Sequence, residues 1–255
     1  MPLLPSVTAA NALVVGASQG IGLEFVKQIL RAPRVVHLFA TYRQPKTAAE
    51  LLAIADEHPN LHAVQMDLTD ESQIESGMRK ISAVAPNLHL AINCVGLLHS
   101  ESQQPEKAIR QLDADKLMNY FKVNSIGPAL LAKHLLAPLK HSEPSLFATI
   151  SAKIGSIGDN RIGGWYGYRA SKAALNMFLK TAAIEYARRS PNTTIVMLHP
   201  GTTDTRLSKP FQRGVPPEKL FSTERTVSQL LDVLSEVTLE DSGEFFSWDG
   251  SRLPW

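Results

Sequence analysis

The sequence contains a single cysteine, Cys94, which excludes an internal disulfide and a cluster of thiolate metal ligands. No apolar run approaches the ~20 residues that are needed to span a bilayer. The amino-terminal segment, Met1 to Asn11, lacks the basic and apolar regions of a signal peptide. We therefore expect a cytoplasmic protein that does not bind a membrane.

The sequence also lacks internal repeats, low-complexity segments and an excess of charge of either sign. Its 26 Lys and Arg residues balance 24 Asp and Glu residues, and no basic stripe interleaves with aromatic residues. This pattern excludes the basic surface that nucleic-acid-binding domains use. With 44% hydrophobic residues, the 255-residue chain can bury a substantial core. We predict one domain over residues 1–255.

Short apolar runs alternate with longer amphipathic stretches along the chain. We predict strands at residues 12–15, 35–41, 61–66, 88–94, 146–150, 195–198 and 243–246. We predict helices at residues 21–30, 47–57, 71–84, 113–140, 166–188 and 224–236, with a bend at Pro128. Continuously apolar strands that alternate with helices indicate a parallel sheet covered on both faces. The predicted fold class is therefore α/β, a single doubly wound Rossmann domain.

The first predicted strand runs into a glycine-rich segment, Gly16-Ala17-Ser18-Gln19-Gly20-Ile21-Gly22. Between a strand and a helix, glycines allow a tight turn and a close approach of the backbone to a pyrophosphate. The N–H groups of the helix amino terminus then face the negative charge. An ordinary glycine-rich loop is the alternative, but the strand–turn–helix context favours a dinucleotide site.

The end of the second predicted strand indicates which dinucleotide is bound. An NAD site places Asp or Glu there to bind the ribose 2′-hydroxyl. The run from Phe39 to Arg43 has no acid and ends in a guanidinium, which can bind a 2′-phosphate through two hydrogen bonds. An exposed surface arginine is the alternative. We predict NADP(H) as the cofactor, with Ser18 close enough along the loop to share the phosphate.

Tyr168 and Lys172 are four residues apart, so they share one face of the predicted helix over residues 166–188. A tyrosine has an unperturbed pKa near ~10. A nearby ammonium favours the phenolate, so we expect Lys172 to lower the pKa of Tyr168. Such a pair suits proton donation to a carbonyl oxygen as the carbon accepts hydride.

The order and spacing of six elements resemble the short-chain dehydrogenase/reductase family over nearly the whole chain. These elements are Gly16-x-x-x-Gly20-x-Gly22, Asp67, Asn93-x-x-Gly96, Asn124, Tyr168-x-x-x-Lys172 and Pro200-Gly201. The runs at 37–43 and 165–172 and the ending at 249–255 resemble the C-factor and sniffer-type carbonyl reductase branch.

The resemblance implies a role for each matching position. Asp67 would accept a hydrogen bond from the adenine amino group, and the turn from Asn93 to Gly96 would line the adenosine. Lys172 would also hold the nicotinamide ribose, and Asn124 would anchor a water that links Lys172 to solvent. The nicotinamide carboxamide would be oriented by Pro200, Gly201, Thr203 and Thr205.

The resulting site prediction names Tyr168, Lys172 and Asn124 as catalytic residues and includes no metal ligand. The residues predicted to bind the cofactor are Gly16, Ser18, Gln19, Gly20, Ile21, Gly22, Tyr42, Arg43, Asp67, Leu68, Asn93, Cys94, Val95, Gly96, Tyr168, Lys172, Pro200, Gly201, Thr203 and Thr205.

One departure from the family pattern concerns the substrate. Members of the family carry a serine after the fifth strand that hydrogen-bonds the substrate oxygen, and here that position is Ala152. Ser151 should point to the opposite side because side chains alternate along a strand. Ser156 could reach the site only if its loop turns inward. Either another hydroxyl substitutes, or catalysis is slow or lost.

Two functions follow from these patterns. The first is an NADPH-dependent reductase of a small, hydrophobic aldehyde or ketone, whose pocket would include Leu97, Leu98, Trp165 and Phe211. The second is an NADP-binding signalling or sensor protein of C-factor type with little or no catalysis, because fold alone does not settle function. The helices at 113–140 and 166–188 carry apolar and small side chains over much of their surface. The resemblance implies that such helices pair across a two-fold axis, so we expect a homodimer or homotetramer.

Overall fold

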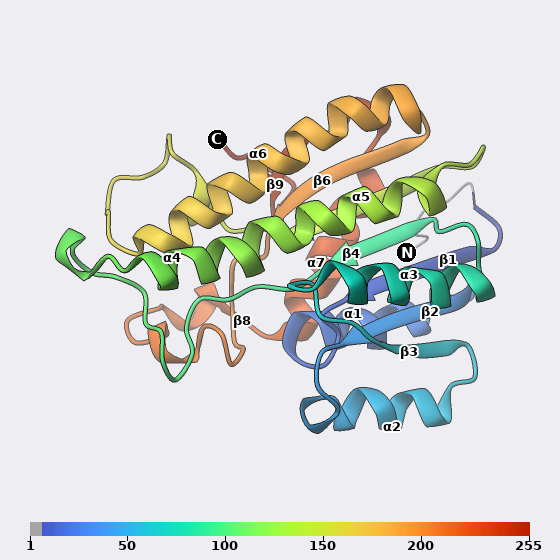
Figure 1. Cartoon of the computed structure of the whole chain (residues 1–255), viewed down its shortest axis with the longest axis horizontal. Helices are drawn as coiled ribbons and strands as arrows, with labels where there is room; N and C mark the ends of the chain where they lie inside the picture. The colour runs from blue at the N-terminus through green and yellow to red at the C-terminus, as the bar shows by residue number, and fades with distance from the viewer. Residues whose placement is uncertain (1–6) are drawn as a thin grey trace.

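The computed structural model describes residues 7–255, in which seven parallel strands form one sheet with the order β3-β2-β1-β4-β5-β6-β9 (Figure 1). Residues 1–6 lie outside the described residues. They are part of the segment for which the sequence predicts no signal peptide. Two further strands pair in a separate small sheet. The strands are β1 Ala10–Val15, β2 Val35–Tyr42, β3 Leu61–Gln65, β4 Leu90–Asn93, β5 Ser145–Ile150, β6 Thr193–His199, β7 Thr202–Thr203, β8 Leu220–Phe221 and β9 Glu244–Ser247.

Helices cover both faces of the large sheet, as the continuously apolar strands predict. In Figure 1, α3, α5 and α6 lie in front of the sheet and α1 and α7 lie behind it. The main helices are α1 Gly20–Leu30, α2 Ala49–Glu57, α3 Glu71–Val84, α4 Ala114–Phe121, α5 Gly127–Leu139, α6 Tyr166–Arg189 and α7 Thr223–Glu236. The predicted α/β doubly wound fold is confirmed.

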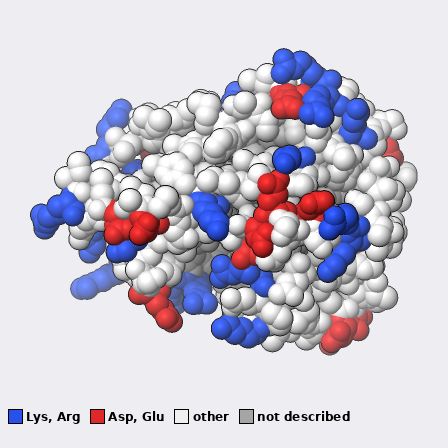
Figure 2. Space-filling model, in the orientation of Figure 1, with Lys and Arg blue, Asp and Glu red and all other residues white. Residues whose placement is uncertain are grey.

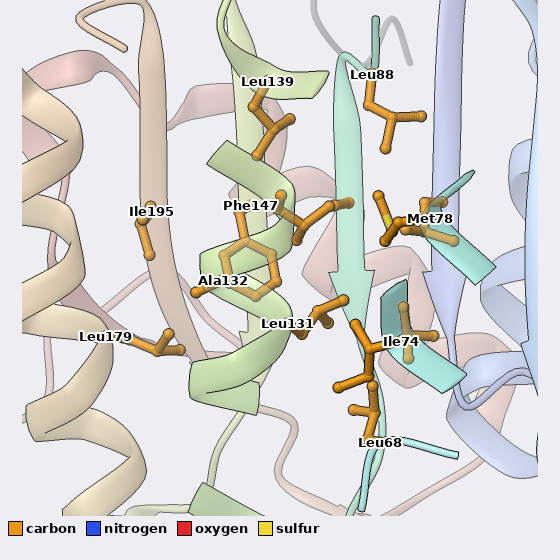
Figure 3. Close-up of a cluster of buried hydrophobic side chains, with 14 of the residues drawn as sticks. Leu68, Ile74, Met78, Leu88, Leu131, Ala132, Leu139, Phe147, Leu179 and Ile195 are labelled. Carbon is orange, nitrogen blue, oxygen red and sulfur yellow. The ribbon is translucent and has the colours of Figure 1, made fainter. Parts of the chain in front are cut away.

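Each face of the sheet carries its own hydrophobic core. All six residues of β5 are buried, because each of the two faces of this central strand packs against its own layer of helices. Figure 3 shows the front core, where Phe147 of β5 lies beside Leu131 of α5, with Ile74 of α3 and Leu179 of α6 around them. Burial of large apolar side chains supplies most of the stabilising free energy of such a domain.

The predicted helix over residues 113–140 is wrong in one respect. The helix is interrupted by a π-helical turn, Lys122–Ile126, in which the N–H of Gly127 donates to the carbonyl of Lys122. The bend that we assigned to Pro128 therefore begins before it. Since Pro128 has no N–H, it cannot bond the carbonyl of Asn124 four residues earlier. A wider turn at this place accommodates the proline and carries Asn124 into the core.

The carboxyl-terminal segment folds back along β9, which is an edge strand of the large sheet. Arg252 forms an antiparallel bridge with Phe246, and the N–H of Leu253 donates to the carbonyl of Phe245 at 2.8 Å. The ring of Trp255 stacks on that of Phe245 with 5.9 Å between centroids. The segment thus occupies hydrogen-bonding groups of the sheet edge.

Charged side chains are spread over the surface in patches of both signs, and a broad area over α6 and the adjoining part of α5 carries few of them (Figure 2). Large apolar side chains are exposed on α4, on the π-helical turn and on α6, namely Met118, Ile126, Met177, Phe178 and Ile184. Within the described residues, no helix combines the length and the hydropathy required to cross a membrane.

Candidate functional site

A cleft with a volume of about 730 Å³ lies at the carboxyl ends of the parallel strands. It passes the point between β1 and β4 where the strand order reverses, which is where ligands bind in open α/β sheets. The turn after β1 and the segment after β4 both line it. The fold therefore brings the predicted dinucleotide site to one place with Tyr168 and Lys172.

Close backbone packing fixes the glycine-rich turn. Gly16 has φ +78°, and its N–H donates to the Thr41 hydroxyl at 3.1 Å. A Cβ atom on Gly22 would lie 2.2 Å from the carbonyl oxygen of Gly16, so only glycine fits at this position. The first turn of α1 therefore lies directly against the end of β1, with its amino terminus at the cleft.

The amino terminus of α1 fits the pyrophosphate of a dinucleotide. Its N-cap residue, Gln19, makes no side-chain capping bond, and the first turn contains no acidic residue. The backbone N–H groups at this end of the helix therefore have no side-chain acceptor and face a cleft lined by Ser18 and Gly20. Such an arrangement binds phosphate oxygens.

One cationic side chain and two hydroxyl groups also line the cleft. Arg43 follows β2 and lines the cleft together with Ser18 and Thr47. The guanidinium of Arg43 is exposed, and no carboxylate stands at the end of β2. Thr47 is the last residue of a short 3₁₀ turn, Pro45–Thr47, and not the first residue of the following helix as predicted. This end of the cleft has the donors that a phosphate group requires.

Lys172 is buried at the carboxyl end of β5. Its ammonium donates to the carbonyl of Ile150 at 3.0 Å, and burial lowers the pKa of Lys172 to about 8. Gly155 leaves room for the side chain, and Gly96 lies at ordinary contact distance from its ammonium. A Cβ atom on Gly155 would lie 2.7 Å from the Cβ of Lys172, and one on Gly96 would lie 3.7 Å from Nζ. The ammonium of Lys172 is therefore held in a fixed position at the wall of the cleft.

Tyr168 lines the same part of the cleft, one helical turn before Lys172. The Lys172 Nζ atom lies 5.9 Å from the centroid of the Tyr168 ring. Burial raises the pKa of Tyr168 above its ordinary value, and the neighbouring Tyr120 adds to this rise. The expectation that Lys172 lowers the pKa of Tyr168 is therefore wrong for this arrangement, because loss of hydration outweighs the distant ammonium.

Asn124 does not line the cleft. It lies behind Gly96, which does. The side-chain oxygen of Asn124 accepts from the N–H of Leu97 at 2.7 Å, and its amide donates to the Leu97 carbonyl at 2.8 Å. The amide also donates to the Ser171 hydroxyl at 3.0 Å. These bonds hold the segment after β4 against α6, and they engage both polar atoms of the side chain.

Asn93 likewise supports the cleft from behind. Its side-chain oxygen accepts from the N–H of Val95 at 3.1 Å, which shapes the turn leading to Gly96. Cys94 lines the cleft, and burial raises the pKa of its thiol, so this group stays protonated at neutral pH. The side chain of Asn93 therefore supports the backbone of this turn, while Cys94, Val95 and Gly96 line the cleft.

The structure places Ala152, and neither nearby serine, at the expected position beside the substrate. Ala152 lines the cleft and packs near Tyr168. Ser151 also lines the cleft, but its hydroxyl donates to the Asn176 side chain at 2.7 Å. The hydroxyl of Ser156 accepts from the N–H of Asp159 at 3.1 Å, and Ser156 does not line the cleft. The second hydrogen-bond donor of the family pattern is therefore not supplied by either serine.

The part of the cleft beside Tyr168 is mostly apolar. Ala152 and Tyr168 belong to a small hydrophobic cluster that also contains Leu97, Leu98, Tyr120, Ile154, Trp165, Leu207 and Phe211. Phe211 belongs to the segment between β7 and α7, and its ring contacts that of Trp165 with 4.8 Å between centroids. This end of the cleft suits an apolar group.

The cleft brings together all the residues predicted to bind the cofactor except Asn93. The cleft is also lined by residues that were not predicted to bind the cofactor, among them Thr41, Thr47, Met66, Thr69 and Asn119. For Thr41, a signal existed in the hydroxyl at the end of β2, next to the glycine-rich turn. The other four were not recognisable without knowing which loops the fold places side by side.

Two histidines and a glutamate form a separate cluster away from the cleft. The Nδ1 atom of His89 accepts from the N–H of Asn11 at 3.1 Å, so the proton on Nε2 is directed to Glu143 at 3.0 Å. His141 donates from Nε2 to the Leu88 carbonyl at 2.7 Å. These bonds tie the segment before β5 to β4 and β1.

Comparisons with known proteins agree with the architecture of the site. A family model described as short chain dehydrogenase matches residues 10–215. The C-signal protein of Myxococcus xanthus is 30% identical over 148 residues, which cover 58% of this chain and 84% of that protein.

Two solved structures resemble this one over nearly their whole lengths. The NADPH-bound carbonyl reductase from chicken fatty liver is 30% identical, with a TM-score of 0.86 and coverage of 97% of this chain and 99% of that one. The carbonyl reductase Sniffer of D. melanogaster is 27% identical, with a TM-score of 0.86 and coverage of 97% and 100%. The chain therefore belongs to the short-chain dehydrogenase family and is an oxidoreductase of that type.

Proposed function

We propose that this protein is an NADPH-dependent carbonyl reductase that converts a small, hydrophobic aldehyde or ketone into an alcohol. The observation that carries the proposal is the presence of Tyr168 and Lys172 in one cleft with the glycine-rich turn of Gly16 to Gly22. The apolar cluster around Tyr168 supports a hydrophobic substrate. The NADPH-bound chicken carbonyl reductase has a similar structure.

The preference for NADPH rests on the end of β2. Arg43 offers an exposed guanidinium there, and Ser18 and Thr47 line the same cleft. A carboxylate at this place would repel a 2′-phosphate, whereas a guanidinium binds it with charge-assisted hydrogen bonds. Asp67 lines the cleft further along and is proposed to bind the adenine.

Tyr168 is the proposed proton donor. A bound nicotinamide supplies the hydride for the carbonyl carbon, so the substrate oxygen needs a proton from the protein. The Tyr168 phenol is protonated at neutral pH, which is the form required for reduction, and burial raises its pKa further. The phenol lies in the cleft with a pocket of apolar side chains beside it, where water is partly excluded.

Lys172 and Asn124 are proposed to support this step. With a pKa of about 8, Lys172 is largely charged at neutral pH, and its bond to Ile150 fixes its position beside the cleft. We propose that any link from Lys172 to solvent uses the backbone carbonyl of Asn124, since both polar atoms of its side chain are engaged. Pro128 leaves that carbonyl without its usual helical partner.

A second function is an NADP-binding signalling or sensor protein with little catalysis. Two observations favour it, namely Ala152 at the place of the expected serine and the similarity to the C-signal protein. The presence of Tyr168 and Lys172 in the cleft favours the reductase, because a sensor has no need of a proton donor.

Three further proposals concern the protein as a whole. We propose that the entire chain forms one domain, since the described strands other than β7 and β8 share one sheet. We propose a homodimer or homotetramer that buries the apolar surface over α4, the π-helical turn and α6. We also propose a cytoplasmic location, with which the single cysteine is compatible.

Replacing Tyr168 by Phe removes the proposed proton donor and keeps the ring. We expect turnover of a hydrophobic aldehyde to fall by at least ~100-fold while the affinity for NADPH changes little. Steady-state kinetics and fluorescence titration with NADPH measure the two quantities. Tyr166→Phe, two residues earlier on α6, is the matched control. Turnover that survives in Tyr168→Phe would refute the assignment.

Replacing Arg43 by Asp tests the cofactor preference. We expect the Kd for NADPH to rise by roughly 100-fold, because a charge-assisted bond is lost and a repulsive charge is gained. The Kd for NADH should change little. Arg110→Asp, outside the cleft, is the control. A parallel loss of affinity for both dinucleotides would show that Arg43 does not contact the 2′-phosphate.

Replacing Ala152 by Ser separates the two proposed functions. If the site is catalytic, a second donor beside the substrate oxygen should raise kcat for simple aldehydes or diketones by on the order of 100-fold. Ser151→Ala serves as a control, because its hydroxyl is directed to Asn176. Absence of turnover in both the parent protein and Ala152→Ser would favour the sensor function.

The lowered pKa of Lys172 predicts a dependence of stability on pH. Between pH 8 and 10.5 the unfolded chain binds the proton that the folded chain has released, so the free energy of unfolding rises with pH. Relative to Lys172→Met, the parent protein should gain about 2 to 3 kcal/mol between pH 7 and pH 10. Urea denaturation measures this difference, and an equal difference at both pH values contradicts the prediction.

A further inference from the structure

We infer that Trp165 is a specificity-determining residue of the substrate pocket, which selects carbonyl compounds with a flat apolar group. The inference rests on the proposed function and names the side chain that reads the substrate. It depends on three observations, which concern the backbone of Trp165, the groups that hold that backbone, and the contacts of the indole ring.

The backbone of Trp165 has an unfavourable conformation. Its φ of 52° and ψ of 43° lie in the left-handed region, and among residues 7–255 it is the only non-glycine residue with a positive φ. The two preceding residues, Gly163 and Gly164, also have positive φ values. Glycine would adopt the same conformation at position 165 without steric cost. Tryptophan at this place therefore calls for an explanation in terms of its side chain.

Glu106 holds the strained residue from one side. Its backbone carbonyl accepts the N–H of Trp165, and its carboxylate accepts the N–H of Gly167 at 3.1 Å. Glu106 is buried, and both bonds lie at the amino terminus of α6, where unpaired N–H groups need an acceptor. The carboxylate thus fixes the turn that leads from Trp165 to Tyr168.

Arg169 holds the same segment from the other side. Its guanidinium donates to the carbonyls of Gly163 at 3.1 Å and Gly164 at 3.0 Å, and also to the carbonyl of Ile154 at 3.2 Å. These three bonds join the loop before Trp165 to the short turn after Ala152. The loop, the position of the missing serine and the start of α6 are therefore held as one unit.

The indole ring uses this placement to form a wall of the pocket. Trp165 lines the cleft, and its ring meets that of Tyr168 edge to face, with 6.3 Å between centroids. On its other side it meets Phe211 at 4.8 Å. Phe211 in turn contacts His99 at 5.6 Å. A row of rings thus runs from the proposed proton donor to the segment between β7 and α7.

This geometry distinguishes substrates by the group attached to the carbonyl. A carbonyl carbon placed next to the Tyr168 hydroxyl directs its substituent toward the apolar cluster, where Trp165 and Phe211 offer ring faces and edges. Aromatic rings in such pairs attract beyond simple burial of area. A phenyl substituent can make these contacts, whereas a methyl substituent is too small to reach them.

Two diketones that differ in one substituent test the inference. 1-Phenyl-1,2-propanedione carries a phenyl group where 2,3-butanedione carries a methyl group. We expect Trp165→Asn to lower the ratio of kcat/KM for the phenyl compound to that for the methyl compound by at least ~10-fold, mainly through KM for the phenyl compound. Trp165→Phe should retain most of the ratio, and Trp255→Asn is a control outside the cleft.

Asparagine tolerates the left-handed conformation, so Trp165→Asn keeps the backbone of the loop. A purely structural role would lower kcat/KM for both diketones alike, would lower Tm, and would overturn the inference. An unchanged ratio of kcat/KM in Trp165→Asn would overturn it as well.

A binding measurement keeps failure of this inference separate from failure of the proposed function. If the parent protein reduces neither diketone, the reductase proposal fails and binding decides the role of Trp165. In the variant Trp248→Phe/Trp255→Phe, Trp165 is the only tryptophan. Saturable quenching of its fluorescence by the phenyl diketone, with only linear quenching by the methyl diketone, supports the inference. Linear quenching by both overturns it.

Discussion

The arrangement of the site depends on the burial of Lys172 at the end of β5. The hydrogen bond from its ammonium to the carbonyl of Ile150 joins α6 to the carboxyl end of β5, where the cleft lies. Gly155 leaves the space for this contact, since a Cβ on it would clash with the lysine. Because Tyr168 lies one turn earlier on the same helix, its position follows from that of Lys172. Burial also opposes the charge of the ammonium and the ionisation of the phenol.

Much of this architecture could be predicted from the sequence, because strong local patterns carry it. Continuous apolar runs identified the seven strands of the large sheet, and the spacing of glycines after β1 placed the dinucleotide turn. The pKa of Tyr168 was predicted in the wrong direction, since spacing along a helix gives proximity but not burial. The support provided by Asn124 was also missed, because its partner Leu97 lies 27 residues away.

The interruption of the helix at Lys122–Ile126 shows a similar limit. Pro128 indicated a bend, but the residues that leave the α-helical conformation, Lys122–Ile126, lie earlier in the chain. The wider turn places Asn124 where it can bond Leu97 and Ser171, so a local irregularity links the segment after β4 to α6. Propensity alone cannot locate such a turn, because its position depends on contacts between distant segments.

The folded-back carboxyl-terminal segment has a consequence for assembly. A free edge strand invites another copy to extend the sheet, yet β9 already has a neighbour in the bridge between Phe246 and Arg252. Two copies therefore cannot build one continuous sheet through β9 without first displacing this segment. Contact through helices leaves each sheet separate, and each cleft keeps its own complete set of residues from a single chain.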